Sequence, residues 1–137
     1  MDINYKLVFI ASIVQFVLGA IWYSPILFGK TWMQIMECTH LSKEELKKMQ
    51  KEMMPFYALQ LFLTFFMTVS LAGLAPYMPE FSIYHVGFWI WIGFVVPTQV
   101  GSVIWANTKK KYWLKQIFIM SGFAFVAVMV AAFILSA

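Results

Sequence analysis

Four apolar runs, each long enough to cross a lipid bilayer as a helix, constrain this sequence more than any other feature. They cover residues 5–23, 55–75, 83–106 and 114–136, and none carries Asp, Glu, Lys or Arg beyond its first turn. A membrane-crossing helix needs about 20 mostly apolar residues, because hydrocarbon offers its backbone no hydrogen bonds. The pattern predicts an all-α fold with four transmembrane helices in a single membrane domain, residues 1–137.

Composition excludes an ordinary soluble domain. Of the 137 residues, 62% are hydrophobic and 12% are charged, whereas a soluble domain carries about 25% charged residues. The net charge is +4, but all ten basic residues are Lys, and nine of them lie in or beside two loops between the runs. Charge in such places sets membrane orientation, so nucleic acid is not an expected partner. The single cysteine, Cys38, excludes an intrachain disulfide and a Cys-rich metal site.

Lys placement predicts the orientation. Residues 24–54 contain five Lys and residues 107–113 contain three, whereas residues 76–82 contain none. Because positively charged loops stay in the cytoplasm, we expect loops 24–54 and 107–113 to be cytoplasmic and both termini to lie outside a bacterial inner membrane. The Lys loops would then meet anionic lipid headgroups. The start "MDINYK" lacks the basic segment of a cleaved signal peptide, so we expect the first run to be retained.

The long first connection predicts one or two short amphipathic helices at the cytoplasmic interface. In "LSKEELKKMQKEM", Ser42 followed by Glu45 is a capping-box pattern. Leu46, Met49 and Met53 recur on one face of the same helix. Such a helix covers the bundle, lies on the lipid surface or binds a protein partner.

The stretch "WYSPILFGKTW" marks a corner where the first run ends. Ser24 is placed to be the N-cap, and Pro25 the first residue, of a short interfacial helix. Aromatic rings are expected here at the depth of the lipid headgroups, with a Lys that reaches their phosphates. The predicted interfacial corner consists of Ser24, Pro25, Phe28, Lys30 and Trp32. Trp22 and Tyr23 precede it, at a place where they could gate a pathway.

Uncharged polar residues inside the spans are the main indication of function. The candidate pathway residues are Gln15, Gly19, Trp22, Tyr23, Gln60, Thr64, Thr98, Gln99 and Ser102. One interpretation is helix packing, because Ser, Thr and Gln hydrogen-bond across helix interfaces. The other is a hydrated pathway or pocket, because three Gln near mid-membrane exceed what packing requires. Embedded acids, the usual carriers of protons and cations, are absent, so a proton-driven exchanger is not expected.

These observations favour an oligomeric transporter or channel for a small solute or ion, with a neutral polar pathway. The alternative is a non-transporting membrane protein that binds lipid or a protein partner through its Lys- and Met-rich cytoplasmic face. Two faces of small residues predict contacts between copies, most simply in a two-fold dimer. They are Gly93, Pro97 and Gly101 in the third run, and Ala124, Ala127 and Ala131 in the fourth. No catalytic, cofactor or metal motif is present, so we expect no enzyme, cofactor or metal.

The segments "MDINY", "LGAIWYSPILFGKTWMQIM" and "WIWIGFVVPTQ" resemble the bacterial integral-membrane family called domain of unknown function 1761. The pattern W-Y-S-P-x-x-F-G-K-x-W, residues 22–32, is the most specific part of a resemblance that spans nearly the whole chain. The resemblance implies a small four-span membrane protein. It implies no activity, because the family has none assigned.

Overall fold

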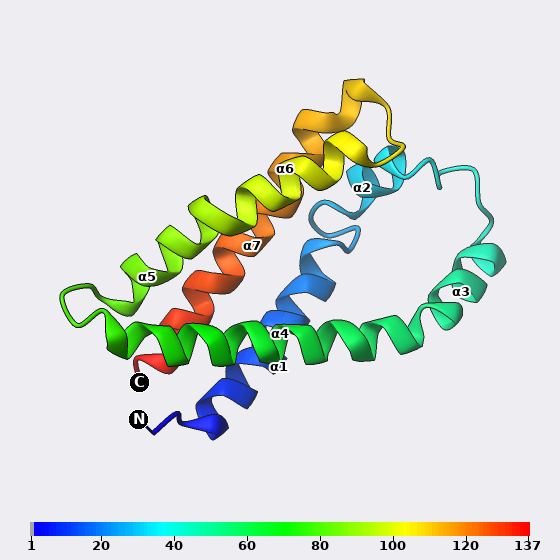
Figure 1. The fold of residues 1–137 in the computed structure, drawn as a ribbon. Helices are drawn as coiled ribbons and strands as arrows, with labels where there is room; N and C mark the ends of the chain where they lie inside the picture. Colours follow the sequence, from blue (N-terminus) through cyan, green and yellow to red (C-terminus); the bar gives the residue numbers. More distant parts are fainter. Residues whose placement is uncertain (1) are drawn as a thin grey trace.

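Helices account for most of the chain in the computed structural model, which describes residues 2–137 (Figure 1). The α-helices are α1 (Tyr5–Trp22), α2 (Gly29–Ile35), α3 (Lys43–Glu52), α4 (Met54–Leu74), α5 (Ile83–Ile90), α6 (Val96–Trp105) and α7 (Trp113–Leu135). Shorter segments are the 3₁₀ turns η1 (Ala75–Tyr77) and η3 (Lys110–Tyr112) and the π-helical η2 (Trp91–Val95). Within the described range 79% of the chain is helical and no residue forms a strand.

Four helical stretches are long and apolar enough to cross a membrane. They are Tyr5–Trp22, Met54–Tyr77, Ile83–Trp105 and Lys110–Leu135. α2 and α3 are short helices between the first and second stretches. The predicted fold class, all-α with four membrane-capable helices, is therefore confirmed.

α1 lies between α4 and α7. It packs against α4 and against α7, and α7 in turn packs against α5, η2 and α6. Both chain ends lie at one end of the bundle, which we call the termini end, and α2, α3 and η3 lie at the other, the Lys-rich end (Figure 1). The buried core joins four helices through Ala11, Leu71, Val86 and Ala131. Small side chains at this centre let the helices approach closely.

The small-residue face of α7 is used inside the chain, so the prediction that it meets another copy is wrong. Ala127 and Ala131 are 7% and 2% exposed, and Ala131 packs in the core beside Ala11. The small-residue face of the third span is not used within residues 2–137 of the chain. A Cβ added at Gly93 in η2 or at Gly101 in α6 would meet no atom within 4 Å. The sequence could not rank these two faces, since both show the same spacing of small residues.

Pro97 accounts for a break in the third span. It is the second residue of α6, which begins directly after the π-helical segment η2. Proline lacks an N–H, and its ring clashes with the carbonyl four residues earlier. A π-helical turn widens the backbone at that point. The Thr98 hydroxyl donates to the carbonyl of Phe94 over 2.6 Å, which adds a bond to the same turn.

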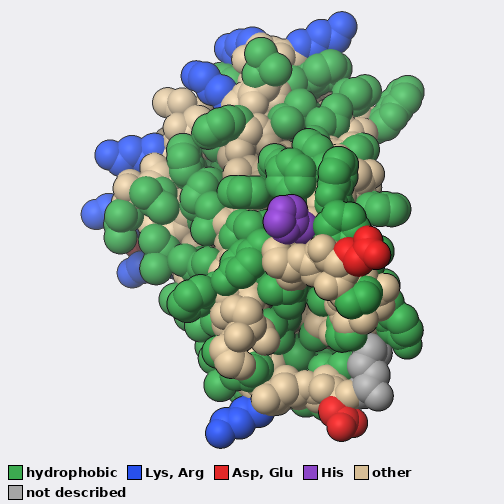
Figure 2. Space-filling view, turned by 90° about the vertical axis from the view of Figure 1, so that its left-hand side faces the viewer, with side chains coloured by type: hydrophobic (Ala, Val, Ile, Leu, Met, Phe, Trp, Pro, Cys, Tyr) green, Lys and Arg blue, Asp and Glu red, His purple; other side chains and the backbone are tan. Residues whose placement is uncertain are grey.

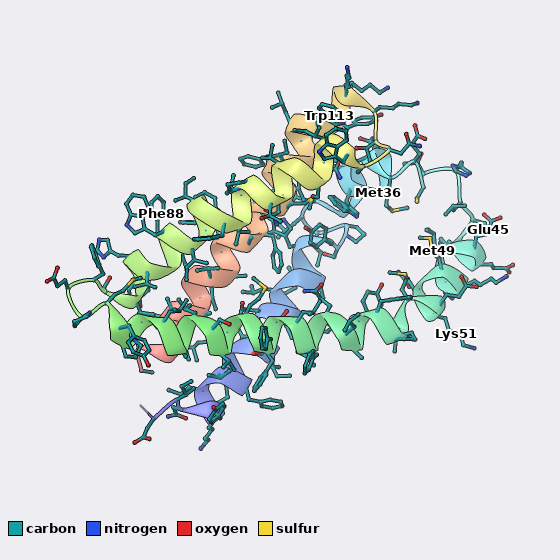
Figure 3. The ribbon with its side chains drawn as sticks, viewed as in Figure 1. Met36, Glu45, Met49, Lys51, Phe88 and Trp113 are labelled. Carbon is teal, nitrogen blue, oxygen red and sulfur yellow. The ribbon has the colours of Figure 1, made fainter. Side chains whose placement is uncertain are left out.

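The capping box predicted for α3 is present. The Ser42 hydroxyl accepts from the Glu45 backbone N–H, and the Glu45 carboxylate accepts from the Ser42 backbone N–H over 2.8 Å. α3 then stands clear of the bundle beside the start of α4 (Figure 1). Met49 lies on the side of α3 that faces Met36 at the end of α2, and Lys51 points away (Figure 3).

A salt bridge joins the two Lys-rich connections. Lys109 Nζ lies 2.7 Å from Glu37 Oε1, so residues 24–54 and 107–113 meet at the same end of the bundle. Glu37 has a φ of 57°, a left-handed conformation that Gly usually takes after a helix. Lys109 holds the pKa of the Glu37 carboxyl below its ordinary value, first through a hydrogen bond and then through charge attraction. The carboxyl is therefore ionised, and the pair intact, at neutral pH.

The first half of α4 leaves the bundle. Residues 51–60 are exposed on every side, and this part of α4 diverges from α1 toward α3 (Figure 1). Toward the termini end α4 meets α1 again, where Thr68 and Leu71 are buried. α4 thus packs within the bundle in its second half, whereas its beginning, residues 54–60, is exposed beside α3.

Candidate functional site

The corner "WYSPILFGKTW" folds into closed turns before α2 begins. The carbonyl of Ser24 accepts from the backbone N–H groups of Leu27, over 3.1 Å, and of Gly29, over 2.8 Å. α2 therefore starts at Gly29 and not at Pro25, so the prediction that Ser24 caps it is wrong. Ser24 instead closes the end of α1, because its hydroxyl donates to the carbonyl of Ile21 over 2.6 Å.

Gly29 is the residue that lets this corner close. A Cβ added there would lie 2.5–2.6 Å from the carbonyl carbon and oxygen of Ser24, and 2.6 Å from the carbonyl oxygen of Tyr23. These obstacles are backbone atoms, which cannot move aside as the end of a side chain can. The neighbouring Lys30 is exposed, and its reach toward lipid phosphates stays a prediction.

Five aromatic rings pack together at the corner. The ring of Trp22 lies 4.8 Å from that of Phe28 and 6.1 Å from that of Phe123, between centroids. The ring of Tyr23 lies 5.0 Å from that of Trp32 and 5.8 Å from that of Phe123. Tilted and edge-on arrangements like these are favourable for aromatic pairs. We call these five residues the aromatic cluster.

Trp22 ties the aromatic cluster to α7. Its indole N–H donates to the carbonyl of Ile119 over 3.0 Å. Its ring lies against Gly122, where an added Cβ would be 3.3 Å from the indole, and Gly19 makes similar room for the ring of Phe123. Trp22 therefore belongs to a joint between two helices. The gating role that the sequence allowed for it stays a prediction.

Gln15 bonds α1 to α4. Its amide donates to the Thr68 hydroxyl over 2.8 Å and to the carbonyl of Ala11 over 3.1 Å. Both partners are buried, and Thr68 donates onward to the carbonyl of Thr64. Thr68 is one of four polar residues on α4, Tyr57, Gln60, Thr64 and Thr68, which we call the α4 polar stripe. The Gln15–Thr68 bond marks the point where this stripe meets α1.

Toward the Lys-rich end the α4 polar stripe leaves α1. The Gln60 amide donates to the Thr64 hydroxyl over 3.4 Å, and that hydroxyl donates to the carbonyl of Gln60 over 2.8 Å, so both bonds stay within α4. Tyr57 and Gln60 are exposed. Amide and hydroxyl groups on this part of α4 can therefore bind something outside residues 2–137.

Gln99 belongs to a second joint, between α6 and α7. Its carbonyl oxygen accepts from the Ser121 hydroxyl over 2.9 Å, and its amide donates to the carbonyl of Met120 over 3.4 Å. Trp91 of η2 donates to the carbonyl of Ser121 over 2.9 Å. Gln99 thus fastens the third span to the fourth, close to the π-helical turn.

Three consecutive carbonyls of α7 accept side-chain donors from three other segments. The carbonyl of Ile119 accepts from the Trp22 side chain, that of Met120 from Gln99, and that of Ser121 from Trp91. Sequence reasoning missed this arrangement, because a backbone acceptor leaves no trace in the pattern of side chains. It also missed Gln116, which is buried and accepts from the Thr108 hydroxyl over 3.0 Å. The sequence did offer one signal for Gln116: it lies just inside a span that follows a run of Lys.

The three candidate glutamines lie in three separate parts of the bundle. Gln15 is in the α1–α4 joint, Gln99 is in the α6–α7 joint, and Gln60 is exposed on α4. Thr98 and Ser102 bond to backbone carbonyls of their own span. Every buried side-chain nitrogen and oxygen in residues 2–137 has a hydrogen-bond partner. Packing therefore accounts for Gln15 and Gln99, whereas it leaves the first half of the α4 polar stripe unexplained.

The chemistry available along the α4 polar stripe is neutral hydrogen bonding. Within residues 2–137, no three His, Cys, Asp or Glu side chains gather closely enough to hold a metal ion. The four spans carry no charged side chain past their first turns. Amides and hydroxyls both donate and accept hydrogen bonds, so the stripe suits water or an uncharged polar solute.

A comparison with protein families places this chain. The model of the family described as "Protein of unknown function (DUF1761)" matches residues 7–136. The chain belongs to this family. The resemblance drawn from residues 22–32 is thereby confirmed, and the DUF1761 match takes in the corner, the α4 polar stripe and both joints. No curated protein and no solved structure matches the chain.

Proposed function

We propose that this DUF1761 protein is an oligomeric channel or transporter that passes a small uncharged polar solute along the α4 polar stripe. One observation carries the proposal: from the Gln15–Thr68 bond the α4 polar stripe continues through half-buried Thr64 to Gln60 and Tyr57, which are exposed within residues 2–137. Polar side chains in a span are costly against hydrocarbon. Polar side chains in a span are therefore expected where water or a solute can reach them.

The Gln15–Thr68 bond is placed to act as the constriction of this pathway. Both side chains are buried and bonded over 2.8 Å, so they hold α1 and α4 in contact at that depth. A passing solute must replace the bond with hydrogen bonds of its own, which a molecule with both donors and acceptors can do. An ion would find no opposite charge within the spans, so its loss of hydration would be poorly compensated.

Replacing Gln15 by Leu should lower solute flux at least about tenfold. The substitution removes the amide that exchanges hydrogen bonds with the solute, and one such bond contributes about 1 kcal/mol, while a bare acceptor adds a further cost. The measurement is the swelling rate of proteoliposomes under gradients of urea, glycerol and small amides. Proteoliposomes that contain wild-type protein should swell faster than empty liposomes for at least one of these solutes.

Gln99→Leu is the matched control for this experiment. It also removes an amide that bonds across two spans, but at the α6–α7 joint rather than beside the α4 polar stripe. We expect it to keep most of the wild-type flux. Equal losses in the two variants, or wild-type swelling no faster than that of empty liposomes, would contradict the proposal.

We further propose that the Lys-rich end faces the cytoplasm of a bacterial inner membrane. The Glu37–Lys109 salt bridge supports this, because it brings both Lys-bearing connections to one end of the bundle. Alkaline phosphatase fused after Ala137 should then be active, since the termini would lie outside. Green fluorescence from a reporter fused at the same position, which folds only in the cytoplasm, would refute this orientation.

A second candidate function is a non-transporting protein that binds anionic lipid or a protein partner through α3. The observation that favours it is the exposure of α3, with Met49 on the side facing α2 and Lys51 opposite (Figure 3). Lys side chains also gather along the margin of an otherwise mostly hydrophobic surface (Figure 2). Changing Leu46, Met49 and Met53 to Ser should then abolish binding to anionic vesicles or the partner, without changing the melting temperature of the spans.

A further inference from the structure

One side of α4 carries a regular row of exposed residues. Its members are Phe56, Gln60, Leu63, Met67, Ser70 and Leu74, and their spacing alternates between four and three residues. All six are exposed, the four apolar ones by 44–58%. Alternating spacings of three and four are typical of a helix that pairs with another helix along its length. We call this row the α4 seam.

The two exposed sides of α4 differ in chemistry. A second exposed row, Leu59, Phe62 and Phe66, lies away from the α4 seam and is wholly apolar, as lipid hydrocarbon requires. The α4 seam contains Gln60 and Ser70. Ser70 donates to the carbonyl of Phe66 over 3.0 Å, but the amide oxygen of Gln60 accepts no hydrogen bond within residues 2–137. Hydrocarbon cannot supply that bond, so a protein is the better neighbour for the α4 seam.

We propose that the α4 seam pairs with the same seam of a second copy, in a two-fold dimer in which the two Gln60 amides bond to each other. In such a dimer both copies have the same orientation in the membrane, and a two-fold axis along the membrane normal places identical residues at identical depth. Each Gln60 then meets its counterpart. An amide carries both donor and acceptor, so two of them are complementary. One polar residue in an apolar seam fixes the register and the number of partners.

Charges on α3 permit the same pairing at the Lys-rich end. α3 carries Lys43, Lys47, Lys48 and Lys51, and also Glu44, Glu45 and Glu52. Glu45 and Lys51 point in different directions from the helix (Figure 3). Two copies of a helix with both signs of charge can lie side by side with opposite charges adjacent, whereas a helix with Lys alone would repel its copy.

This inference deepens the proposed function, and it rests on that proposal in one respect: the second copy closes the exposed side of the pathway. Tyr57 and Thr64 share their side of α4 with Thr68, which faces α1. They therefore lie between the α4 seam and α1 and line the pathway, whereas Gln60, at the edge shared by the α4 polar stripe and the α4 seam, bonds to its counterpart and closes the side of the pathway. The dimer would leave one pathway in each copy, next to the paired α4 helices.

Oxidative cross-linking tests the pairing without any flux. In a Cys38→Ser background, single substitutions Phe56→Cys, Leu63→Cys and Met67→Cys should form disulfide-linked dimers in native membranes, because paired seams bring like positions within disulfide reach. Leu59→Cys, Phe62→Cys and Phe66→Cys are matched controls at similar depth in the other exposed row. We expect their dimer yield to be lower by about fivefold or more, since a disulfide tolerates only a narrow range of Cα separations.

The pattern of cross-linked positions decides the outcome. Dimers confined to the α4 seam support the proposal. Equal yields in both rows, no dimer at any seam position, or efficient dimer formation only by Gly101→Cys on α6 would overturn it. The last result would show that copies meet through the small residues of the third span.

The role of Gln60 has a test of its own. Gln60→Leu should raise the dimer dissociation constant, measured by energy transfer between labelled copies diluted in liposomes, about threefold for one lost bond and about eightfold for two. An unchanged or lower constant would overturn the Gln60 pair. Seam cross-links without flux would refute the proposed function alone, whereas Gln15-dependent flux without seam cross-links would refute the pairing alone.

Discussion

Replacing Gly29 by Ala should lower the free energy of unfolding by about 3 kcal/mol. The added Cβ would lie 2.5–2.6 Å from backbone atoms of Ser24 and Tyr23, so the turn that joins α1 to α2 must open. Overpacking typically costs about 1–3 kcal/mol, and the upper end applies where backbone must move. Unfolding by increasing fractions of denaturing detergent, followed by far-ultraviolet circular dichroism, measures the change.

Gly101→Ala provides the control. It makes the same chemical change within a span, at a position where a Cβ meets no atom within 4 Å. Stability should be unchanged or higher by up to about 1 kcal/mol, because Ala favours a helix over Gly. If Gly29→Ala unfolded at the same detergent fraction as Gly101→Ala, the corner would not be closed as described.

Replacing Trp22 by Ala should also cost about 3 kcal/mol. It removes a large ring from the aromatic cluster and its indole bond to the carbonyl of Ile119, and a Trp-to-Ala change in a packed site costs about 3–5 kcal/mol. The lower end applies here, because Trp22 is only half-buried. The same unfolding measurement reports the change.

Trp22→Phe separates the two contributions. It keeps an aromatic ring but loses the N–H and the outer part of the indole that lies against Gly122, so it should cost more than the about 0.6 kcal/mol of a hydrogen bond between spans and less than the Ala variant. An Ala variant no less stable than the Phe variant would show that ring packing at this joint contributes nothing.

The sequence predicted those features that depend on residues close together along the chain. The four spans follow from the length of each apolar run, and the α3 capping box follows from Ser42 and Glu45 three residues apart. The start of α2 was missed for a related reason. Ser24 and Pro25 are a good local start for a helix, but the Ser24 carbonyl is taken up by Gly29 and Leu27 in turns that only the closed corner reveals.

The candidate site was predicted in its residues but not in its arrangement. Gln15, Gln60 and Gln99 stood out because amides are rare in apolar runs, yet their partners depend on which spans are neighbours. Gln15 meets Thr68 because α1 crosses α4, and Gln99 meets Ser121 because α6 packs on α7. No single-sequence pattern specifies such pairings, and none indicates that half of α4 leaves its own bundle.

Water access to Thr64 tests the central claim, that the α4 polar stripe lines a pathway. In a Cys38→Ser background, Thr64→Cys should react with a membrane-impermeant thiol reagent added at the Lys-rich side. Phe66→Cys, two residues along on the apolar row, should react at least about tenfold more slowly, because a thiol must ionise in water to react. Faster reaction at Thr64→Cys is the result this account predicts. Equal rates at the two positions would contradict it.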